Sequence, residues 1–188
     1  MKMTLICLLF IGSSFFVAGQ DRNREEKGAD SVGQIIERKY NRFKDETTVT
    51  LKRQRILDSK SPRQVLEMVA KATFKGEKPT DLFDAVEVVF TSSAEKSPYT
   101  GSIELNFIVD GERVRGSHAS VGRSFIPTPP LAPDLKLAKN IVAVVNIDAL
   151  RKVAGGKKVE MQLGPTELTL DDTTLNNLRE FASSVFGK

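Results

Sequence analysis

The stretch Ile103-Glu104-Leu105-Asn106-Phe107-Ile108-Val109-Asp110-Gly111 decides the fold class of this chain. Its apolar residues at 103, 105, 107 and 109 alternate with Glu104 and Asn106, which is the period of a half-buried β-strand. Asp-Gly favours a tight turn whose twist matches that of the flanking strands. We therefore expect residues 112–118 to return antiparallel, in a protein built mainly of β-hairpins.

Other segments carry the same signal. Strands are predicted at 47–51, 85–90, 141–147, 159–163 and 166–170, because each is β-branched, alternating or continuously apolar. Residues 61–75 leave two alternatives open. Ser61-Pro62 with Gln64 is typical of a helix start, whereas the alternation from Leu66 to Phe74 favours a strand. The strand is the preferred interpretation.

Three segments have helical patterns. Apolar residues at 32, 35, 36, 40 and 43 recur at three- and four-residue steps and predict a short N-terminal helix. Asp148 is expected to cap a short helix that ends at Gly155-Gly156. Asp171 is the expected cap of a C-terminal helix whose apolar stripe must pack on the sheet. The predicted class is α+β and mainly β: an antiparallel sheet or sandwich of about seven to eight strands, with an N-terminal and a C-terminal helix.

The N-terminus has the layout of a secretory signal. Lys2 precedes an uncharged, largely apolar run at 3–17, and Val17-Ala18-Gly19 offers compact residues for cleavage after Gly19. This run is shorter than the roughly twenty apolar residues of a membrane-spanning helix. The predicted organisation is a signal peptide at 1–19, a flexible polar arm at 20–30 and a single β-rich domain at 31–188. An exported protein, periplasmic or extracellular, is expected, with no transmembrane span after cleavage.

The composition excludes many of the catalytic and metal-binding sites that depend on His and Cys side chains. Of the 188 residues one is Cys and one is His, and the expected cleavage removes Cys7, so no disulfide is expected. His118 has no sequence neighbours that suggest a nucleophile, and no phosphate-loop or calcium-loop spacing is present. We therefore predict no catalytic residue, no cofactor and no metal site, and an enzyme is the less favoured class.

Charge is distributed unevenly along the chain. The whole sequence carries +4, yet residues 38–63 hold nine basic residues against three acidic ones. Such a patch suits an anionic envelope component, namely glycans or lipid headgroups, or an acidic protein partner. The residues predicted for this contact are Arg42, Lys52, Arg53 and Arg55. Export argues against nucleic acid as the partner.

One resemblance supports the envelope location. Lys157–Leu170 with the following helix to Phe181, together with Phe107–Arg113, resembles the C-terminal part of exported bacterial β-rich proteins with no assigned activity. The shared features are structural, so the resemblance implies no catalytic residues.

The preferred function is therefore an exported, non-enzymatic binding or structural domain at the bacterial envelope or outside the cell. One alternative is a hydrolase that uses carboxylates such as Glu104, Glu160 or Glu167 without His or Cys chemistry. The other is a carrier of an apolar ligand held between sheet and helix, lined by Leu105, Phe107, Leu178 and Phe181.

Overall fold

Nine antiparallel strands form one continuous sheet in the order β1-β2-β3-β4-β7-β6-β5-β8-β9. The computed structural model describes residues 34–60, 63–79, 85–94, 96–122 and 137–186. The strands are β1 (Ile36–Asn41), β2 (Glu46–Lys60), β3 (Arg63–Lys75), β4 (Ala85–Ala94), β5 (Ser102–Val109), β6 (Glu112–Gly122), β7 (Leu137–Asn146), β8 (Val159–Leu163) and β9 (Thr166–Thr169). Residues Gly33–Lys188 make one compact unit.

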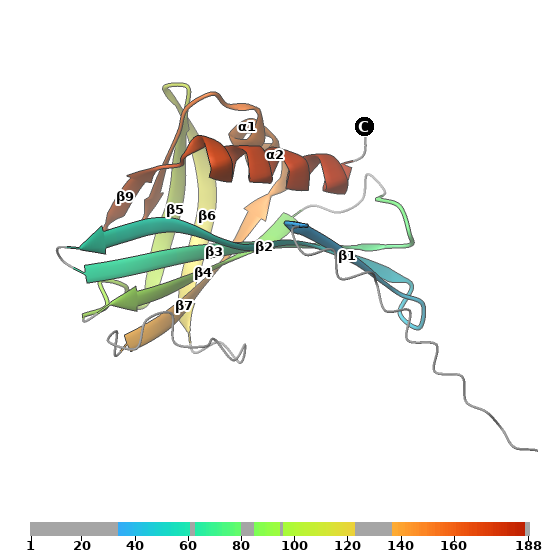
Figure 1. Ribbon diagram of the computed structural model, residues 1–188, viewed down its shortest axis with the longest axis horizontal. Helices are drawn as coiled ribbons and strands as arrows, with labels where there is room; N and C mark the ends of the chain where they lie inside the picture. The colour runs from blue at the N-terminus through green and yellow to red at the C-terminus, as the bar shows by residue number, and fades with distance from the viewer. Residues whose placement is uncertain (1–33, 61–62, 80–84, 95, 123–136, 187–188) are drawn as a thin grey trace, which may run out of the picture. The chain divides into compact units, whose positions relative to one another are not determined.

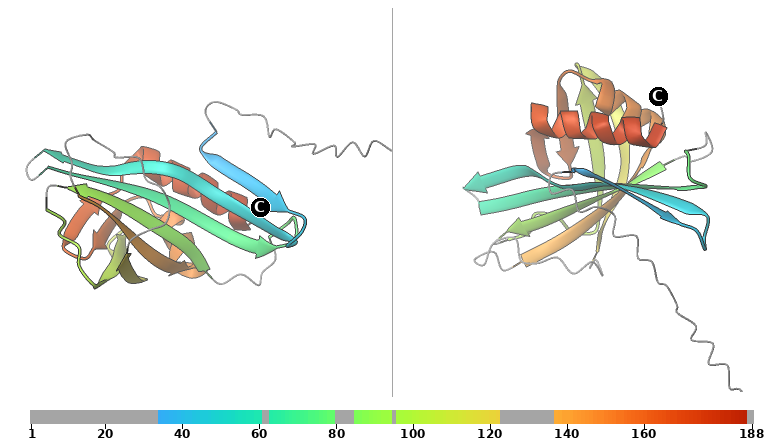
Figure 2. Two further views of the ribbon diagram at one scale, coloured as in Figure 1. Left: turned by 90° about the horizontal axis from the view of Figure 1, so that it is seen from below. Right: turned by 45° about the vertical axis from the view of Figure 1, so that its right-hand side comes forward.

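The sheet curls into a half-barrel around two helices. Figure 1 shows β5 and β6 rising steeply from the plane of β2, β3 and β4, while both helices lie on the enclosed side. The helices are α1 (Ile147–Gly155) and α2 (Asp172–Phe186), and Figure 2 shows α2 lying along one face of the sheet from two further sides. The prediction of a mainly β antiparallel fold with a C-terminal helix packed on it is confirmed. Of the two predicted arrangements, the single sheet is present and the sandwich is wrong.

The predicted N-terminal helix is also wrong, because residues 36–41 form β1 and residues 42–45 the following turn, while Val32 lies outside the described residues. Ile36 is buried opposite Leu51 of β2, whereas Tyr40 and Phe43 are 44% and 88% exposed. The three- and four-residue apolar spacing therefore marks no buried helix face. Among the described residues it arises from buried Ile36, partly buried Ile35 and two aromatic residues that face solvent. Together with β1, the part of the chain that the structure describes has nine strands in the sheet, where seven to eight were predicted.

Residues 63–75, which the sequence left open between helix and strand, are strand β3. Leu66, Met68 and Ala70 face the core, as strand alternation requires. Leu66 lies opposite Leu57 of β2 and Ser92 of β4, so β3 is paired on both sides. Central placement in the sheet favours a strand, whose backbone groups are then all bonded to neighbours.

The Asp110-Gly111 hairpin forms as predicted. Both residues have positive φ, at 51° and 92°, which a two-residue turn of this kind requires and which Gly adopts at no steric cost. The Asp110 carboxylate also accepts hydrogen bonds from the backbone amides of Lys157 and Lys158, and these hold its pKa below the usual value. The turn thereby fixes the start of β8 against β5.

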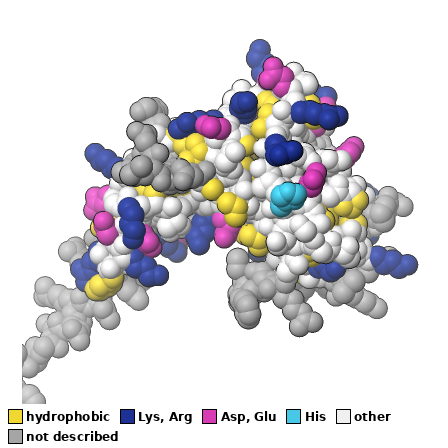
Figure 3. Space-filling view, turned by 180° about the vertical axis from the view of Figure 1, so that it is seen from behind, with side chains coloured by type: hydrophobic (Ala, Val, Ile, Leu, Met, Phe, Trp, Pro, Cys, Tyr) yellow, Lys and Arg dark blue, Asp and Glu magenta, His cyan; other side chains and the backbone are white. Residues whose placement is uncertain are grey.

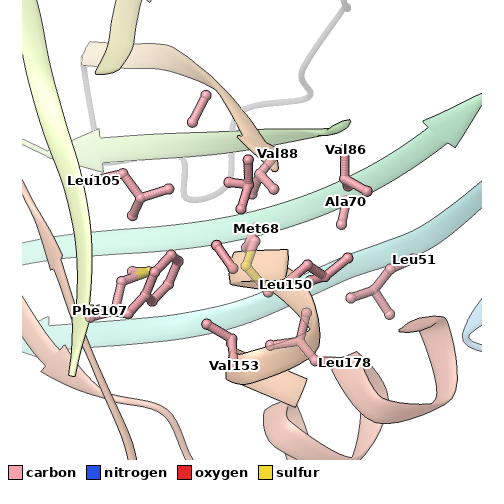
Figure 4. Close-up of a cluster of buried hydrophobic side chains, with 14 of the residues drawn as sticks. Leu51, Met68, Ala70, Val86, Val88, Leu105, Phe107, Leu150, Val153 and Leu178 are labelled. Carbon is pink, nitrogen blue, oxygen red and sulfur yellow. The ribbon is translucent and has the colours of Figure 1, made fainter. Parts of the chain in front are cut away.

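The core lies between the concave face of the sheet and the two helices. Figure 4 shows side chains from β2 to β5 converging on Leu150 and Val153 of α1 and Leu178 of α2. Asp171 caps α2 as predicted, accepting a 2.7 Å hydrogen bond from the Thr174 amide. The cap of α1 is Asn146, which accepts from the Ala149 amide at 2.7 Å, and not the predicted Asp148. Asp148 lies inside the first turn, where a negative charge still favours the helix dipole.

Tyr99 connects the two distant parts of the sheet. Its side chain is fully buried, and its hydroxyl donates to Thr166 Oγ1 of β9 at 2.7 Å while accepting from Gln64 Nε2 of β3 at 3.0 Å. Burial raises the pKa of this phenol. The β4–β5 loop that carries Tyr99 thus bridges strands that are not neighbours in the sheet.

The signal at 1–19 and the arm at 20–30 lie outside the described residues. Within the described ranges, no helix is long and apolar enough to cross a membrane.

Candidate functional site

The turn between β1 and β2 is held in one shape by its own side chains. We call residues Asn41–Asp45 the hairpin tip. Asn41 Oδ1 accepts from the backbone amides of Phe43 and Lys44 at 3.0 and 3.3 Å. Asp45 has a φ of 51°, accepts a 2.8 Å hydrogen bond from the Tyr40 hydroxyl, and through its carbonyl accepts from the Gly76 amide. The hydrogen bond to Asp45 raises the pKa of Tyr40.

This turn presents an aromatic ring to solvent between two cations. Phe43 is 88% exposed, and the Arg42 guanidinium carbon lies 5.0 Å from the centre of its ring. Lys44 follows directly in sequence. No carboxylate of the described chain forms an ion pair with Arg42 or Lys44. The hairpin tip therefore combines exposed apolar area with two cations that form no ion pair among the described residues, while its one carboxylate, Asp45, accepts from the Tyr40 hydroxyl.

The other three predicted contact residues lie in the middle of β2, where the strand is irregular. Lys52 and Arg53 fall in a register shift between Leu51 and Gln54, and a second shift follows Arg55. Arg53 Nε lies 3.1 Å from Glu67 Oε2, and Arg55 lies 3.1 Å from Asp58 Oδ2. The Glu67 side chain is only 7% exposed. Two of the predicted anion-binding cations are thus already paired within the fold.

Glu67 is a buried carboxylate on β3. Burial raises its pKa, while Arg53 and Arg55 act in the opposite direction. Its Oε2 atom has no hydrogen-bond partner among the described residues, although Arg53 is at ion-pair distance. Arg53 and Arg55 therefore serve mainly to compensate Glu67, and Lys52 remains as an exposed cation beside them.

The structure does not bring the four predicted cations together. Arg42 lies at the hairpin tip, whereas Lys52 is six residues along β2 from Glu46, which at about 3.3 Å per residue is roughly 20 Å. The sequence correctly identifies a basic segment. The apolar spacing assigns Phe43 to a helix face and misses its exposure at a turn. The signal that could have shown the turn is the run of residues from Asn41 to Asp45, because Asn and Asp favour turns.

The three carboxylates predicted for hydrolysis line one groove on the outer face of the sheet, the face opposite the helices. This groove has a volume of about 890 Å³ and is lined by side chains of β5, β6, β8 and β9. Glu104 accepts from Asn106 Nδ2 at 3.2 Å, and Glu167 accepts from Gln162 Nε2 at 2.8 Å. Glu160 is paired with Lys158. Each acid is therefore bonded to a neighbouring N–H donor within the fold.

His118 lies directly opposite Glu104 in the β5–β6 register, and both side chains are exposed. Figure 3 shows the face with the histidine, where an acidic and a basic side chain lie beside it. The sequence placed no carboxylate near this histidine, because cross-strand neighbours are set by register. Within the described ranges, no group of three His, Cys, Asp or Glu side chains is arranged to hold a metal ion.

The residues predicted to line an apolar ligand cavity belong to the core. Leu105 and Phe181 are fully buried, and Phe107 and Leu178 are at most 8% exposed. All four belong to one cluster with α1 and the sheet. The side chains of the sheet and of α2 therefore fill the space that a ligand between them would occupy.

Comparison with known proteins adds no relative: no protein-family model, curated protein or solved structure matches this chain. The resemblance to exported bacterial proteins remains a prediction.

Proposed function

We infer that this protein is an exported, non-enzymatic binding domain that docks on an anionic lipid surface through the hairpin tip. The observation that carries the proposal is the 88% exposure of Phe43 with the Arg42 guanidinium over its ring. The signal layout at residues 1–19 supports an envelope or extracellular location for that surface.

An aromatic ring between cations suits a lipid interface better than a glycan or a protein pocket. Phe is among the apolar residues that membrane-surface elements bury at the boundary between headgroups and acyl chains, with Lys and Arg on the polar side. Lys and Arg beside an anionic leaflet contribute about 1 kcal/mol each. The ring of Phe43 projects from a turn instead of lining a concavity, so its apolar area is best buried by insertion into a soft surface.

The test is co-sedimentation with vesicles of phosphatidylcholine, with and without phosphatidylglycerol. The protein lacking residues 1–19 is used, because the apolar signal would itself bind lipid. Binding should require phosphatidylglycerol and weaken as salt rises, since screening shortens the reach of charges at the surface.

Variants of the hairpin tip separate this mode from general electrostatic attraction. Phe43→Ser should weaken binding about tenfold or more, because an exposed ring is worth roughly 1.5–3 kcal/mol when fully buried. Arg42→Gln should weaken it about fivefold. Lys52→Gln, which removes the same charge from the middle of β2, is the matched control and should have little effect.

The proposal fails if Lys52→Gln weakens binding as much as Arg42→Gln, or if Phe43→Ser binds like the unchanged protein. The proposal is likewise contradicted if the protein binds acidic glycans but has no affinity for the vesicles. Arg53 and Arg55 are unsuitable test positions, because reversing their charge would place acids beside the buried Glu67.

A further inference from the structure

The groove on the outer face has an ordered arrangement of charge that the lipid-binding function does not use. Its first row runs across four strands through register partners Arg115 (β6), Asn106 (β5), Gln162 (β8) and Glu167 (β9). The row thus passes from a cation through two amides to a carboxylate. Side chains at alternate positions of these strands share one face, so all four point away from the core.

A second row lies beside the first and has the same polarity. It runs through Arg113 (β6), Ile108 (β5), Glu160 (β8) and Thr169 (β9), again as direct register partners. Ile108 is 37% exposed and places an apolar side chain in the middle of the groove. Both rows therefore have Arg at the β6 side and Glu at the β8–β9 side.

The two charged sides are not matched to each other within the fold. Neither Arg113 nor Arg115 forms an ion pair with a carboxylate of the described residues. On the other side, within the described residues, Glu167 accepts from the Gln162 amide, and Glu160 is paired with Lys158, the residue just before β8. A charged ligand group at either side would gain charge-assisted hydrogen bonds.

We propose that this groove binds a short peptide with free ends, its carboxylate at Arg113 and Arg115 and its amino group at Glu160 and Glu167. Neighbouring strands are about 4.8 Å apart, so the first row spans roughly 14 Å from β6 to β9. An extended chain rises about 3.4 Å per residue, which makes three to four residues the matching length. Asn106 and Gln162 then face the peptide amides, and Ile108 contacts a small apolar side chain.

The size of the groove agrees with this ligand. Its volume of about 890 Å³ falls within the range of small-molecule sites, which is roughly 300–1,000 Å³. Along the two rows the lining has bases at the β6 side and acids at the β8–β9 side, while Glu104 of β5, which also lines the groove, accepts from Asn106. A ligand charged at one end only would therefore satisfy half of the two rows.

The experiment is calorimetric titration of the whole purified protein with tetra-alanine. Saturable binding is expected, and blocking either end of the peptide should weaken it about tenfold, by N-acetylation for the Glu side and by C-terminal amidation for the Arg side. These peptides test the proposal on the unchanged protein, so no result depends on a variant folding.

Variants then assign each end. Arg115→Gln should weaken binding of tetra-alanine about tenfold but have little further effect on the amidated peptide; Glu167→Gln should show the same pattern with the acetylated peptide. Lys96→Gln, which removes an exposed charge elsewhere, is the control. Absence of saturable binding, equal affinity for end-blocked peptides, or binding of a neutral oligosaccharide in place of tetra-alanine would overturn the proposal.

Discussion

Phe43 is exposed because the residues around it fix the turn. The Asn41 side chain accepts from two backbone amides of the hairpin tip, and Asp45 is tied to both Tyr40 and Gly76. A turn held in this way has little freedom to fold the ring back onto the sheet. The unfavourable hydration of the exposed Phe43 ring is therefore relieved only when a partner covers it.

Glu67 illustrates a single residue that links stability to pH. Its pKa is raised above 4.5 by burial, with Arg53 and Arg55 opposing the shift. A carboxyl group whose pKa is higher in the folded state binds its proton more tightly there. Its contribution to stability is therefore fully present below the unfolded pKa and is lost as pH rises through the folded pKa.

Glu67→Gln should remove this pH dependence. The difference to follow is the unfolding free energy of the variant minus that of the unchanged protein. This difference should increase as pH is raised from about 4 towards neutrality, by about 1.4 kcal/mol for each unit by which folding raises the Glu67 pKa. Urea unfolding at a series of pH values measures the difference, in which all other titrations cancel. A difference that stays constant with pH, or that decreases as pH rises, would contradict a raised Glu67 pKa in the folded protein.

Strand β6 illustrates how one element is shaped by a close approach. Its pairing with β5 shifts register between Leu105 and Asn106, and Gly116 lies at that irregularity. A Cβ atom at Gly116 would lie 2.5 Å from the carbonyl oxygen of Leu105 and 3.0 Å from a ring carbon of Phe107. The strand can bend here only because residue 116 has no side chain.

Gly116→Ala should therefore destabilise the protein by about 2 kcal/mol or more, since backbone atoms of β5 must move. Gly122→Ala is the matched control on the same strand, because a Cβ there meets no atom within 4 Å. That variant should stay within about 0.5 kcal/mol of the unchanged protein. Urea midpoints compare the two, and similar losses at both positions would show that the β6 irregularity does not require glycine.

The whole sheet depends on contacts between segments that are far apart in sequence. The β4–β7 pairing joins the N-terminal strands to the β5–β6 hairpin, and the Tyr99 hydroxyl connects β3 with β9. Gln64 is only 9% exposed, so its amide depends on that hydroxyl as its partner.

Tyr99→Phe should lower the free energy of unfolding by about 1–3 kcal/mol, because it leaves the buried Gln64 amide and Thr166 hydroxyl without their shared partner. Tyr40→Phe removes the only other tyrosine hydroxyl, which is exposed, and should cost less than about 0.5 kcal/mol. Thermal unfolding of both variants gives the comparison. Equal shifts would mean that the Tyr99 bridge does not stabilise the sheet.

These long-range contacts mark the limit of what the sequence predicts. Alternation and turn chemistry are local, so the 103–118 hairpin, the 66–74 strand and the Asp171 cap could be predicted. The structure of residues 36–43 could not, because three- and four-residue apolar spacing occurs by chance in a short edge strand followed by a turn. The cations of the candidate site were recognisable, yet register decides that Arg53 and Arg55 pair with Glu67, and turn geometry decides that Phe43 is exposed.

The chain contains no tryptophan, so Phe43→Trp creates a single fluorescent reporter at the hairpin tip. Emission from this variant should shift to shorter wavelength when vesicles containing phosphatidylglycerol are added, and should not shift with phosphatidylcholine alone, because the indole enters the apolar interface only when the flanking cations engage anionic headgroups. Ile108→Trp, which places the reporter in the outer groove, should show no shift under the same conditions. An unchanged emission from Phe43→Trp in the presence of bound anionic vesicles, or an equal shift from both reporters, would contradict docking through the hairpin tip.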